Sequence, residues 1–252
     1  MDRVLNLPFS GLHTLDTKKE NKWLLDRLLY GIRTLVCRSK IMNIKVTFSI
    51  LSLTTLFFSC NLSGQEQTRA IQTTAPQEKA IAVFAEGCFW CSEHIFEEIA
   101  GVDSAVSGYT GGHLKNPTYE QVCSETTGHA EAVMVYYDPK VLTYSDLLDA
   151  FFSSHDPTTL NRQGPDVGTS YRSAIFYKSD EEEALVRKAI MKWTPAFKNP
   201  IVTDVEPLKE FYRAEEYHQN YAVSNPGSSY IRNVSMPRFE LFKRECKLKL
   251  KE

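Results

Sequence analysis

An apolar run from Ala80 to Ala85 leads directly into the five residues Gly-Cys-Phe-Trp-Cys at 87–91, which begin a helical pattern. The run predicts a strand over 80–86. Apolar positions at Phe89, Ile95, Phe96 and Ile99 predict a helix over 89–99, with Gly101 as its C-cap glycine. A strand that turns at once into a helix places both cysteines in the first helical turn.

The two thiols are expected to have a chemical role. Cys88 would lie at the positive end of the helix dipole, which favours its thiolate and makes it the candidate nucleophile. Residues at i and i+3 on a helix have Cβ atoms about 5–6 Å apart, close to the separation a disulfide tolerates. Cys88 and Cys91 can therefore cycle between dithiol and disulfide. Phe89 and Trp90 indicate an apolar wall beside the nucleophile.

Other uses of this C-x-x-C pair are open at this point. A zinc site would need His94 and Cys123 as further ligands, and the sequence has no second C-x-x-C. Haem attachment requires His after the second Cys, where this chain has Ser92. A structural disulfide is a further alternative. A thioredoxin-like oxidoreductase is the main rival, because its motif also follows a strand and begins a helix. Cys123 is otherwise expected to be a small buried residue, and no metal or cofactor is expected.

Strands alternate with helices along the rest of the chain. Further strands are predicted over 131–137, 172–178 and 201–205, and helices over 145–152, 179–193 and 209–221. The helix at 179–193 begins with a capping box, Ser179 to Glu182. Residues 103–129 are expected to form a long irregular segment. We therefore expect an α+β fold, a two-layer ferredoxin-like α/β plait with a mixed sheet, helices packed on it and long coil segments.

The composition is that of a globular protein. Of 252 residues, 42% are hydrophobic and 24% are charged, and the net charge of −2 does not indicate a nucleic-acid partner. The folded domain is expected to span 80–252 and to be a monomer, with 61–79 as a flexible tether. The tail 238–252 has a net charge of +3 and is expected to form a solvated surface helix.

The N-terminal region has the pattern of an export signal over 42–60. A short basic start at Met42 precedes an apolar stretch of thirteen residues without charge, 46–58, and then Ser59-Cys60. Thirteen residues are fewer than the roughly 20 that span a bilayer. The pattern resembles a bacterial lipoprotein signal, in which Cys60 would be lipidated and would anchor an exported protein to a membrane, facing the periplasm or cell exterior. Plain signal cleavage or a single-pass anchor are the alternatives. Residues 1–41 do not fit a signal and are expected to be a non-native upstream extension, with translation starting at Met42.

Six short motifs together resemble a known family, the A-type peptide methionine sulfoxide reductases. In the family's order, these motifs are Gly-Cys-Phe-Trp (87–90), Gly-Tyr-x-Gly-Gly (108–112), Asn-Pro-Thr-Tyr (116–119), Thr-Gly-His-Ala-Glu (127–131), His-Asp-Pro (155–157) and Tyr-Arg-Ser-Ala-Ile (171–175). The resemblance covers about 81–226. It implies reduction of methionine S-sulfoxide, free or in oxidised proteins, with a thioredoxin-like reductant.

The resemblance also implies a role for individual residues. Cys88 would attack the sulfoxide sulfur, leaving a sulfenic acid, while Phe89 and Trp90 would wall the S-methyl group. Glu131 would act as the acid, and the residues themselves support this, since a carboxyl at the mouth of an apolar strand is desolvated and stays protonated. Tyr119 and Tyr171 would donate hydrogen bonds to the sulfoxide oxygen, and Asp166 would lie in the motif that positions Tyr171 and orders the site. Cys91 is expected to resolve the sulfenic acid, with Cys246 as the alternative or a relay partner.

Overall fold

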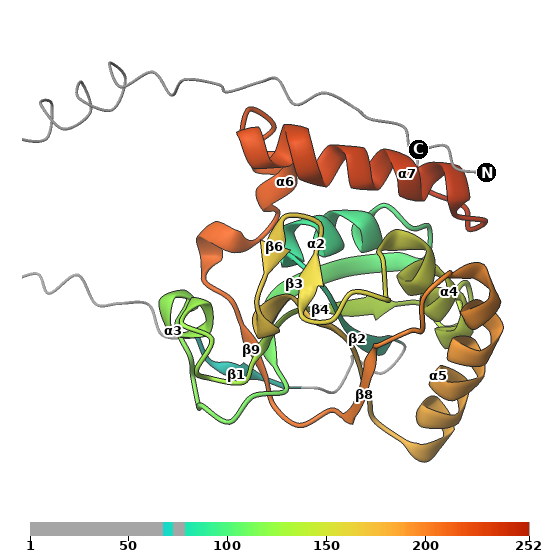
Figure 1. Cartoon of the computed structure of the whole chain (residues 1–252), viewed down its shortest axis with the longest axis horizontal. Helices are drawn as coiled ribbons and strands as arrows, with labels where there is room; N and C mark the ends of the chain where they lie inside the picture. The colour runs from blue at the N-terminus through green and yellow to red at the C-terminus, as the bar shows by residue number, and fades with distance from the viewer. Residues whose placement is uncertain (1–67, 73–78, 252) are drawn as a thin grey trace, which may run out of the picture. The chain divides into compact units, whose positions relative to one another are not determined.

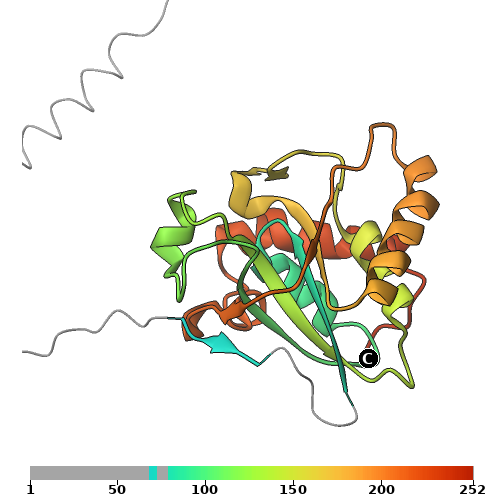
Figure 2. The ribbon, with the colours of Figure 1, turned by 90° about the horizontal axis from the view of Figure 1, so that it is seen from below.

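A mixed seven-stranded sheet organises the chain. The computed structural model describes residues 68–72 and 79–251, and the strand order is β1-β9-β3-β4-β2-β7-β8. The strands are β1 (Ala70–Ile71), β2 (Ala80–Glu86), β3 (Val102–Thr110), β4 (Ala130–Tyr137), β7 (Ser173–Tyr177), β8 (Asp204–Pro207) and β9 (Phe211–Arg213). All neighbours are antiparallel except β7 and β8, which are parallel. Figures 1 and 2 place β1 at one end of the sheet and α5 at the other.

The helices connect these strands and cover the sheet. They are α2 (Phe89–Glu97), α3 (Tyr119–Cys123), α4 (Tyr144–Ser154), α5 (Asp180–Trp193), α6 (Tyr221–Ser224) and α7 (Met236–Glu245). A small hairpin of β5 (Arg162–Gln163) and β6 (Asp166–Val167) lies between β7 and α4 in the sequence. None of the helices in the described part of the chain is long and apolar enough to cross a membrane.

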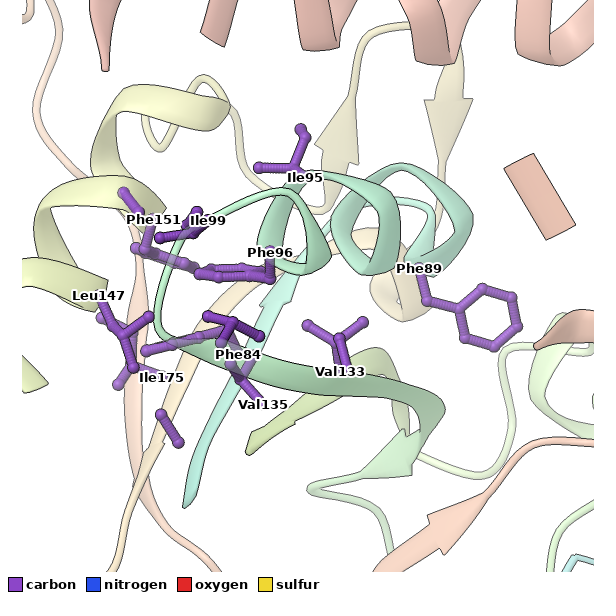
Figure 3. Packing of buried hydrophobic residues seen from close by; sticks show 14 of the residues in the cluster. Phe84, Phe89, Ile95, Phe96, Ile99, Val133, Val135, Leu147, Phe151 and Ile175 are labelled. Carbon is purple, nitrogen blue, oxygen red and sulfur yellow. The ribbon is translucent and has the colours of Figure 1, made fainter. Parts of the chain in front are cut away.

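The two faces of the sheet have separate apolar cores. Along β2, Ala82 and Phe84 point to the core under α2 and α4, while Ile81, Val83 and Ala85 point to the opposite face, as the period of two in a strand requires. The helical side is rich in aromatic residues, and the Phe84 ring lies 5.2 Å from that of Phe96 (Figure 3). Because both faces of β2 are buried, its sequence is a continuous apolar run.

Most of the predicted elements are confirmed, with small shifts at their ends. The strand at 80–86 and the start of the helix at residue 89 are as predicted, but α2 ends at Glu97 and Gly101 makes a later turn with φ of +99°. Ser179 caps α5 by accepting the backbone N–H of Glu182, whose own side chain accepts from the Lys178 N–H, so the reciprocal capping box is not formed. The strand expected at 201–205 occurs three residues later, as β8.

Two segments were predicted wrongly. The segment expected to be irregular, 103–129, contains β3, a nine-residue strand between β4 and β9. Its polar residues and Gly108 hid the strand pattern, yet glycine is required there, because a Cβ at Gly108 would lie 2.4 Å from the Phe211 ring and from the Tyr212 carbonyl oxygen. The helix expected over 209–221 is instead β9, a short 3₁₀ turn and α6.

Both ends of the described chain are attached to the domain. Within the predicted tether, β1 pairs with β9, and the Thr68 hydroxyl donates to the carbonyl of Pro117. The C-terminal tail is not a fully solvated helix, because Phe239 and Phe242 of α7 are buried and Leu250 forms a bridge with Ile99. Residues 1–41, 42–60, 61–67 and 73–78 lie outside the described residues, as does the predicted lipidation site at Cys60.

Candidate active site

The turn after β2 places the N-terminus of α2 at one end of the sheet. Gly87 makes this turn with φ of +92°, which glycine adopts without strain. Cys88 is the N-cap residue of α2, and its carbonyl accepts the Cys91 backbone N–H at 3.1 Å. A cavity of about 190 Å³ begins at this point. Its lining residues are Cys88, Phe89, Trp90, Tyr119, Glu131, Asp166, Tyr171 and Tyr230, so the predicted catalytic and substrate-binding residues meet here, except for Cys91.

The alternation of β4 aims Glu131 at this cavity. Val133 and Val135 belong to the core on the helical side, so Glu131 shares their face and reaches the N-terminus of α2. Its Oε2 accepts the backbone N–H of Phe89 at 3.1 Å. Burial raises the pKa of this carboxyl to about 8, against the opposing effect of that hydrogen bond. Glu131 is therefore a neutral acid at pH 7, able to donate a proton.

The two cysteines differ from the expected arrangement. Burial raises the pKa of Cys88, and the hydrogen bond that its thiol donates to Cys91 acts in the same direction. Acceptance of that bond and, to a smaller extent, the positive charge of Arg238 lower the pKa of Cys91 to about 6, against the opposing effect of burial. The dipole at the N-terminus of α2 does not by itself make Cys88 a thiolate, because burial opposes it and the Phe89 N–H is used by Glu131. Of the two thiols, Cys91 is therefore the more acidic.

Tyr119 is held in place through its backbone. Its N–H donates to Glu215 Oε1 at 2.9 Å, and the other oxygen of that carboxylate accepts the Tyr109 hydroxyl, also at 2.9 Å. Thr118 begins α3 with a capping box that includes Gln121. Burial raises the pKa of the Tyr119 phenol, and the neighbouring Glu131 carboxyl raises it further. The phenol thus stays protonated and can donate a hydrogen bond.

Tyr171 is positioned by the residues immediately before it. Glu125 accepts the Ser170 hydroxyl at 2.6 Å, the Ser170 backbone N–H at 3.1 Å and the Thr169 hydroxyl at 2.5 Å. Gly168 permits this contact, since a Cβ there would lie 2.3 Å from a Glu125 carboxylate oxygen. Burial also raises the pKa of Tyr171, so it is a second phenolic donor facing the cavity.

The aromatic residues of the motif are fixed by a histidine that the sequence analysis did not select. His218 Nδ1 accepts the indole N–H of Trp90 at 3.0 Å, and its ring lies 4.9 Å from Phe89 and 4.4 Å from Tyr119. Burial lowers the pKa of His218 to about 4, so the ring is neutral. Trp90 also stacks on Tyr221, with 3.8 Å between ring centroids. These contacts make the cavity wall rigid.

Tyr230 is a second lining residue that was missed. Its hydroxyl donates to Asp166 Oδ2 at 2.6 Å. Asp166 was expected to lie in the motif that positions Tyr171 and orders the site; its own hydrogen bond is to Tyr230, and Glu125 holds the segment that carries Tyr171. Tyr230 follows the last residue of the family resemblance, 226, and no local pattern around it suggested a site residue.

Cys123 lies beside the cavity, where its thiol is hydrogen-bonded to the Tyr119 hydroxyl, whereas Cys246 and His94 lie elsewhere. Cys123 is exposed rather than buried, and Cys246 is half-buried at the end of α7. His94 contacts the ring of Phe239 at 4.5 Å. Within residues 68–72 and 79–251, no three His, Cys, Asp or Glu side chains are arranged to hold a metal ion.

The cavity combines one thiol of the pair, Cys88, with groups that hold protons at neutral pH. A thiol attacking next to a neutral carboxylic acid and two phenols suits a substrate whose oxygen must be protonated as it leaves. The fold and the site thus define a thiol-dependent oxidoreductase.

Comparison with known proteins narrows this class to one family. The sequence matches the family model for peptide methionine sulfoxide reductase over residues 80–250. It is 49% identical over 178 residues to peptide methionine sulfoxide reductase MsrA 1 of Rhodopirellula baltica, covering 71% of this chain and 92% of that one. It is 53% identical over 158 residues to MsrA of Pasteurella multocida, covering 63% and 91%.

A solved structure agrees with the sequence comparisons. The crystal structure of reduced Mxr1 from Saccharomyces cerevisiae aligns with a TM-score of 0.59 and 36% identity, covering 71% of this chain and 95% of that one. This chain belongs to the peptide methionine sulfoxide reductase family, and it reduces methionine S-sulfoxide to methionine.

Proposed function

We propose that Cys88 is the attacking nucleophile and Glu131 the acid of this reaction. The observation that carries the proposal is the neutral Glu131 carboxyl, held at the N-terminus of α2 by the Phe89 N–H in the cavity that Cys88 lines. Cys88 Sγ attacks the sulfoxide sulfur while Glu131 protonates its oxygen. The protonated oxygen then passes as a hydroxyl from the methionine sulfur to Cys88 Sγ, the transient Sγ–S bond breaks, and methionine leaves with Cys88 as a sulfenic acid. Tyr119 and Tyr171 donate hydrogen bonds to the oxygen as its charge develops.

Cys91 has two successive roles in this proposal. Its sulfur accepts the hydrogen bond of the Cys88 thiol, so it can take up the Cys88 proton as Cys88 attacks the sulfoxide. Cys91, now a thiol, then condenses with the Cys88 sulfenic acid. A disulfide forms and water leaves.

Cys91 is favoured over Cys246 as the resolving residue by position. Cys246 follows Arg238 on α7 by eight residues, which is about 12 Å along a helix axis. Its Sγ accepts the Leu248 N–H at 3.4 Å, in a segment tied to the end of α2 by the Lys251–Glu98 backbone hydrogen bond. For Cys246 to reach Cys88, this segment would have to detach.

The S-methyl group of the substrate is assigned to the wall made by Phe89 and Trp90. Both side chains line the cavity, and both are fixed by His218. A rigid apolar wall excludes water from the methyl group and orients the sulfur towards Cys88.

The proposal also covers the source of electrons for the enzyme and the location of the protein in the cell. A thioredoxin-like dithiol would return the Cys88–Cys91 disulfide to the thiol state, since two electrons are needed for each turnover. The pattern over 42–60 supports export and lipidation at Cys60, with translation from Met42. Fractionation of cells, with and without a block of lipoprotein processing, tests this part; activity that stays in the soluble cytosolic fraction contradicts it.

We also propose that the centre of the sheet is a ferredoxin-like plait. Its support is the strand order β3-β4-β2-β7 with α2 and α4 as the two helical connections, which is a β-α-β-β-α-β arrangement.

One experiment tests the catalytic proposal directly. The reduced enzyme is mixed with a methionine sulfoxide peptide without reductant. The masses of the peptide and of the enzyme are then measured by mass spectrometry. We expect the peptide to lose one oxygen and the wild-type enzyme to gain a Cys88–Cys91 disulfide. In Cys91→Ser, a sulfenic acid should stay on Cys88. Oxygen on any other cysteine contradicts the assignment.

A further inference from the structure

A second and larger cavity reaches the cysteine pair from another side. It has a volume of about 760 Å³ and lies between the C-terminal ends of α4 and α5, the β5–β6 hairpin and α7. Figure 1 shows β6 beside the N-terminal end of α7. We call it the α7 groove, and its residues include Cys91, Phe152, Trp193, Phe197, Arg238 and Leu241.

The two cavities divide the cysteine pair between them. Cys88 lines the small cavity but not the α7 groove, whereas Cys91 lines the α7 groove but not the small cavity. Asp166 and Tyr230 line both, so their hydrogen-bonded pair is the partition. Both residues are buried, with 6% of Cys88 and 1% of Cys91 exposed, and each faces a different cavity.

The assignment of the two sulfurs to different cavities matters because a reductant must reach one of them in thiol–disulfide exchange. A thiolate attacks one sulfur of a disulfide along the S–S axis, from the side opposite the sulfur that leaves, and forms a mixed disulfide. Approach to Cys88 leads through the cavity of about 190 Å³, whose walls are fixed side chains. Approach to Cys91 leads through the larger α7 groove. When Cys91 is attacked, Cys88 leaves next to the neutral Glu131, which can protonate it.

The lining of the α7 groove suits a protein rather than a small thiol. Aromatic rings of Phe152, Trp193 and Phe197 line it, and Leu241 exposes 44% of its surface at its edge. Aromatic and aliphatic residues around a buried reactive group are typical of the centre of a protein interface. Lys198 and Asp156 provide a polar margin.

We propose that the α7 groove seats the active-site loop of a thioredoxin-like protein, whose nucleophilic cysteine attacks Cys91. This inference rests on the proposed role of Cys91 as the resolving residue. The reductant thiolate forms a bond to Cys91 Sγ as the Cys91–Cys88 bond breaks. The second thiol of the reductant then displaces Cys91, which leaves a reduced enzyme and an oxidised reductant.

Substitution at the edge of the α7 groove tests the docking site. The probe is a bacterial thioredoxin regenerated by thioredoxin reductase and NADPH, acting on the full-length protein. We expect Leu241→Glu to lower kcat/KM for thioredoxin by about tenfold, with unchanged single-turnover reduction of the sulfoxide and unchanged turnover with dithiothreitol. The matched control is Leu185→Glu on α5, which is also exposed and lies outside the groove. Phe197→Ala is a second groove variant, should Leu241→Glu fail to fold.

Other results of this experiment overturn the proposal. An unchanged kcat/KM for thioredoxin in both groove variants shows that the reductant docks elsewhere. A raised KM for the sulfoxide peptide, with normal use of thioredoxin, shows that the groove holds the substrate polypeptide instead.

Trapping separates the docking proposal from the catalytic one. The oxidised enzyme is mixed with a thioredoxin variant that lacks its second cysteine, and the mixed disulfide is mapped by mass spectrometry. A bond to Cys91 supports the α7 groove, and a bond to Cys88 overturns it. If the oxidised enzyme has no Cys88–Cys91 disulfide before thioredoxin is added, the role of Cys91 itself is wrong.

Discussion

The guanidinium of Arg238 lies 2.6 Å from Glu86 Oε1 and joins α7 to the end of β2. Glu86 is fully buried, and its other oxygen accepts the Ser154 hydroxyl at 2.6 Å. Arg238 Nε donates to the Ser154 carbonyl at 2.7 Å. Burial raises the pKa of Glu86 to about 6, although the charge of Arg238 acts against it. This ion pair lies beside Gly87. Because the charge of Arg238 lowers the pKa of Cys91, α7 also affects the acidity of that thiol.

Removal of Arg238 should affect both stability and thiol reactivity. In Arg238→Met, Glu86 loses its partner in the interior, and we expect a loss of about 3 kcal/mol in the free energy of unfolding. The thiolate of Cys91 should form at higher pH, measured by alkylation rate against pH. Urea unfolding checks the first effect, with the double variant Arg238→Met and Glu86→Gln as control. A double variant as unstable as the single one would contradict the ion-pair explanation.

Glu131→Gln should slow the chemical step. A glutamine keeps the shape and can accept the Phe89 N–H, but it cannot donate the required proton. We expect the single-turnover rate to fall about 10²–10⁴-fold, the usual contribution of general acid catalysis. In the wild type, this rate should decline as pH rises through about 8, where Glu131 loses its proton. Glu240→Gln on the exposed side of α7 is the control. An unchanged single-turnover rate removes Glu131 from the mechanism.

The same substitution should change how stability depends on pH. The raised pKa of Glu131 means that the folded state binds this proton more tightly than the unfolded state, whose carboxyl has the ordinary pKa of 4.5. The contribution is fully present below about 4.5 and is lost as pH rises to about 8. We therefore expect Glu131→Gln to match the wild type at pH ~5 and to exceed it by a few kcal/mol at pH ~9. Thermal unfolding at both pH values measures this, and parallel pH profiles of the two proteins would disprove it.

Cys91→Ser should separate the first turnover from recycling. The variant should form one methionine per enzyme, more slowly at neutral pH because the group that accepts the Cys88 proton is gone, and it should not cycle with thioredoxin. Cys246→Ser and Cys123→Ser should cycle normally. Sustained cycling of Cys91→Ser would transfer the resolving role to Cys123 or Cys246.

Gly108→Ala tests why β3 contains a glycine. The added Cβ would meet the Phe211 ring and the Tyr212 carbonyl at 2.4 Å, so β9 must move away. We expect a loss of about 1–3 kcal/mol in the free energy of unfolding. Gly227→Ala is the control, since a Cβ there has no heavy atom within 4 Å. Equal stability of the two variants would contradict the packing argument.

Local pattern alone predicted the strand–helix unit that carries the cysteines. A continuous apolar run predicted β2, and apolar residues spaced three to four apart predicted α2; an apolar run likewise places Glu131 at the mouth of a strand. Such periodicity reveals an element only where apolar residues mark its buried face. It failed for β3, where serines and Gly108 occupy a strand covered on both sides, and for β9, whose three residues are too few to show a period.

By itself, the sequence determined the two thiols, the acid and the phenols, because their order along the chain is a property of short motifs. The tertiary structure alone decided that the two thiols differ in acidity, since the pKa values of Cys88 and Cys91 depend on burial, on their mutual hydrogen bond and, for Cys91, on Arg238. Tyr230 and Arg238 lie more than a hundred residues from the cysteines in the chain. Only the packing of the segment around α7 brings them to the site, and no local pattern encodes a contact over that separation.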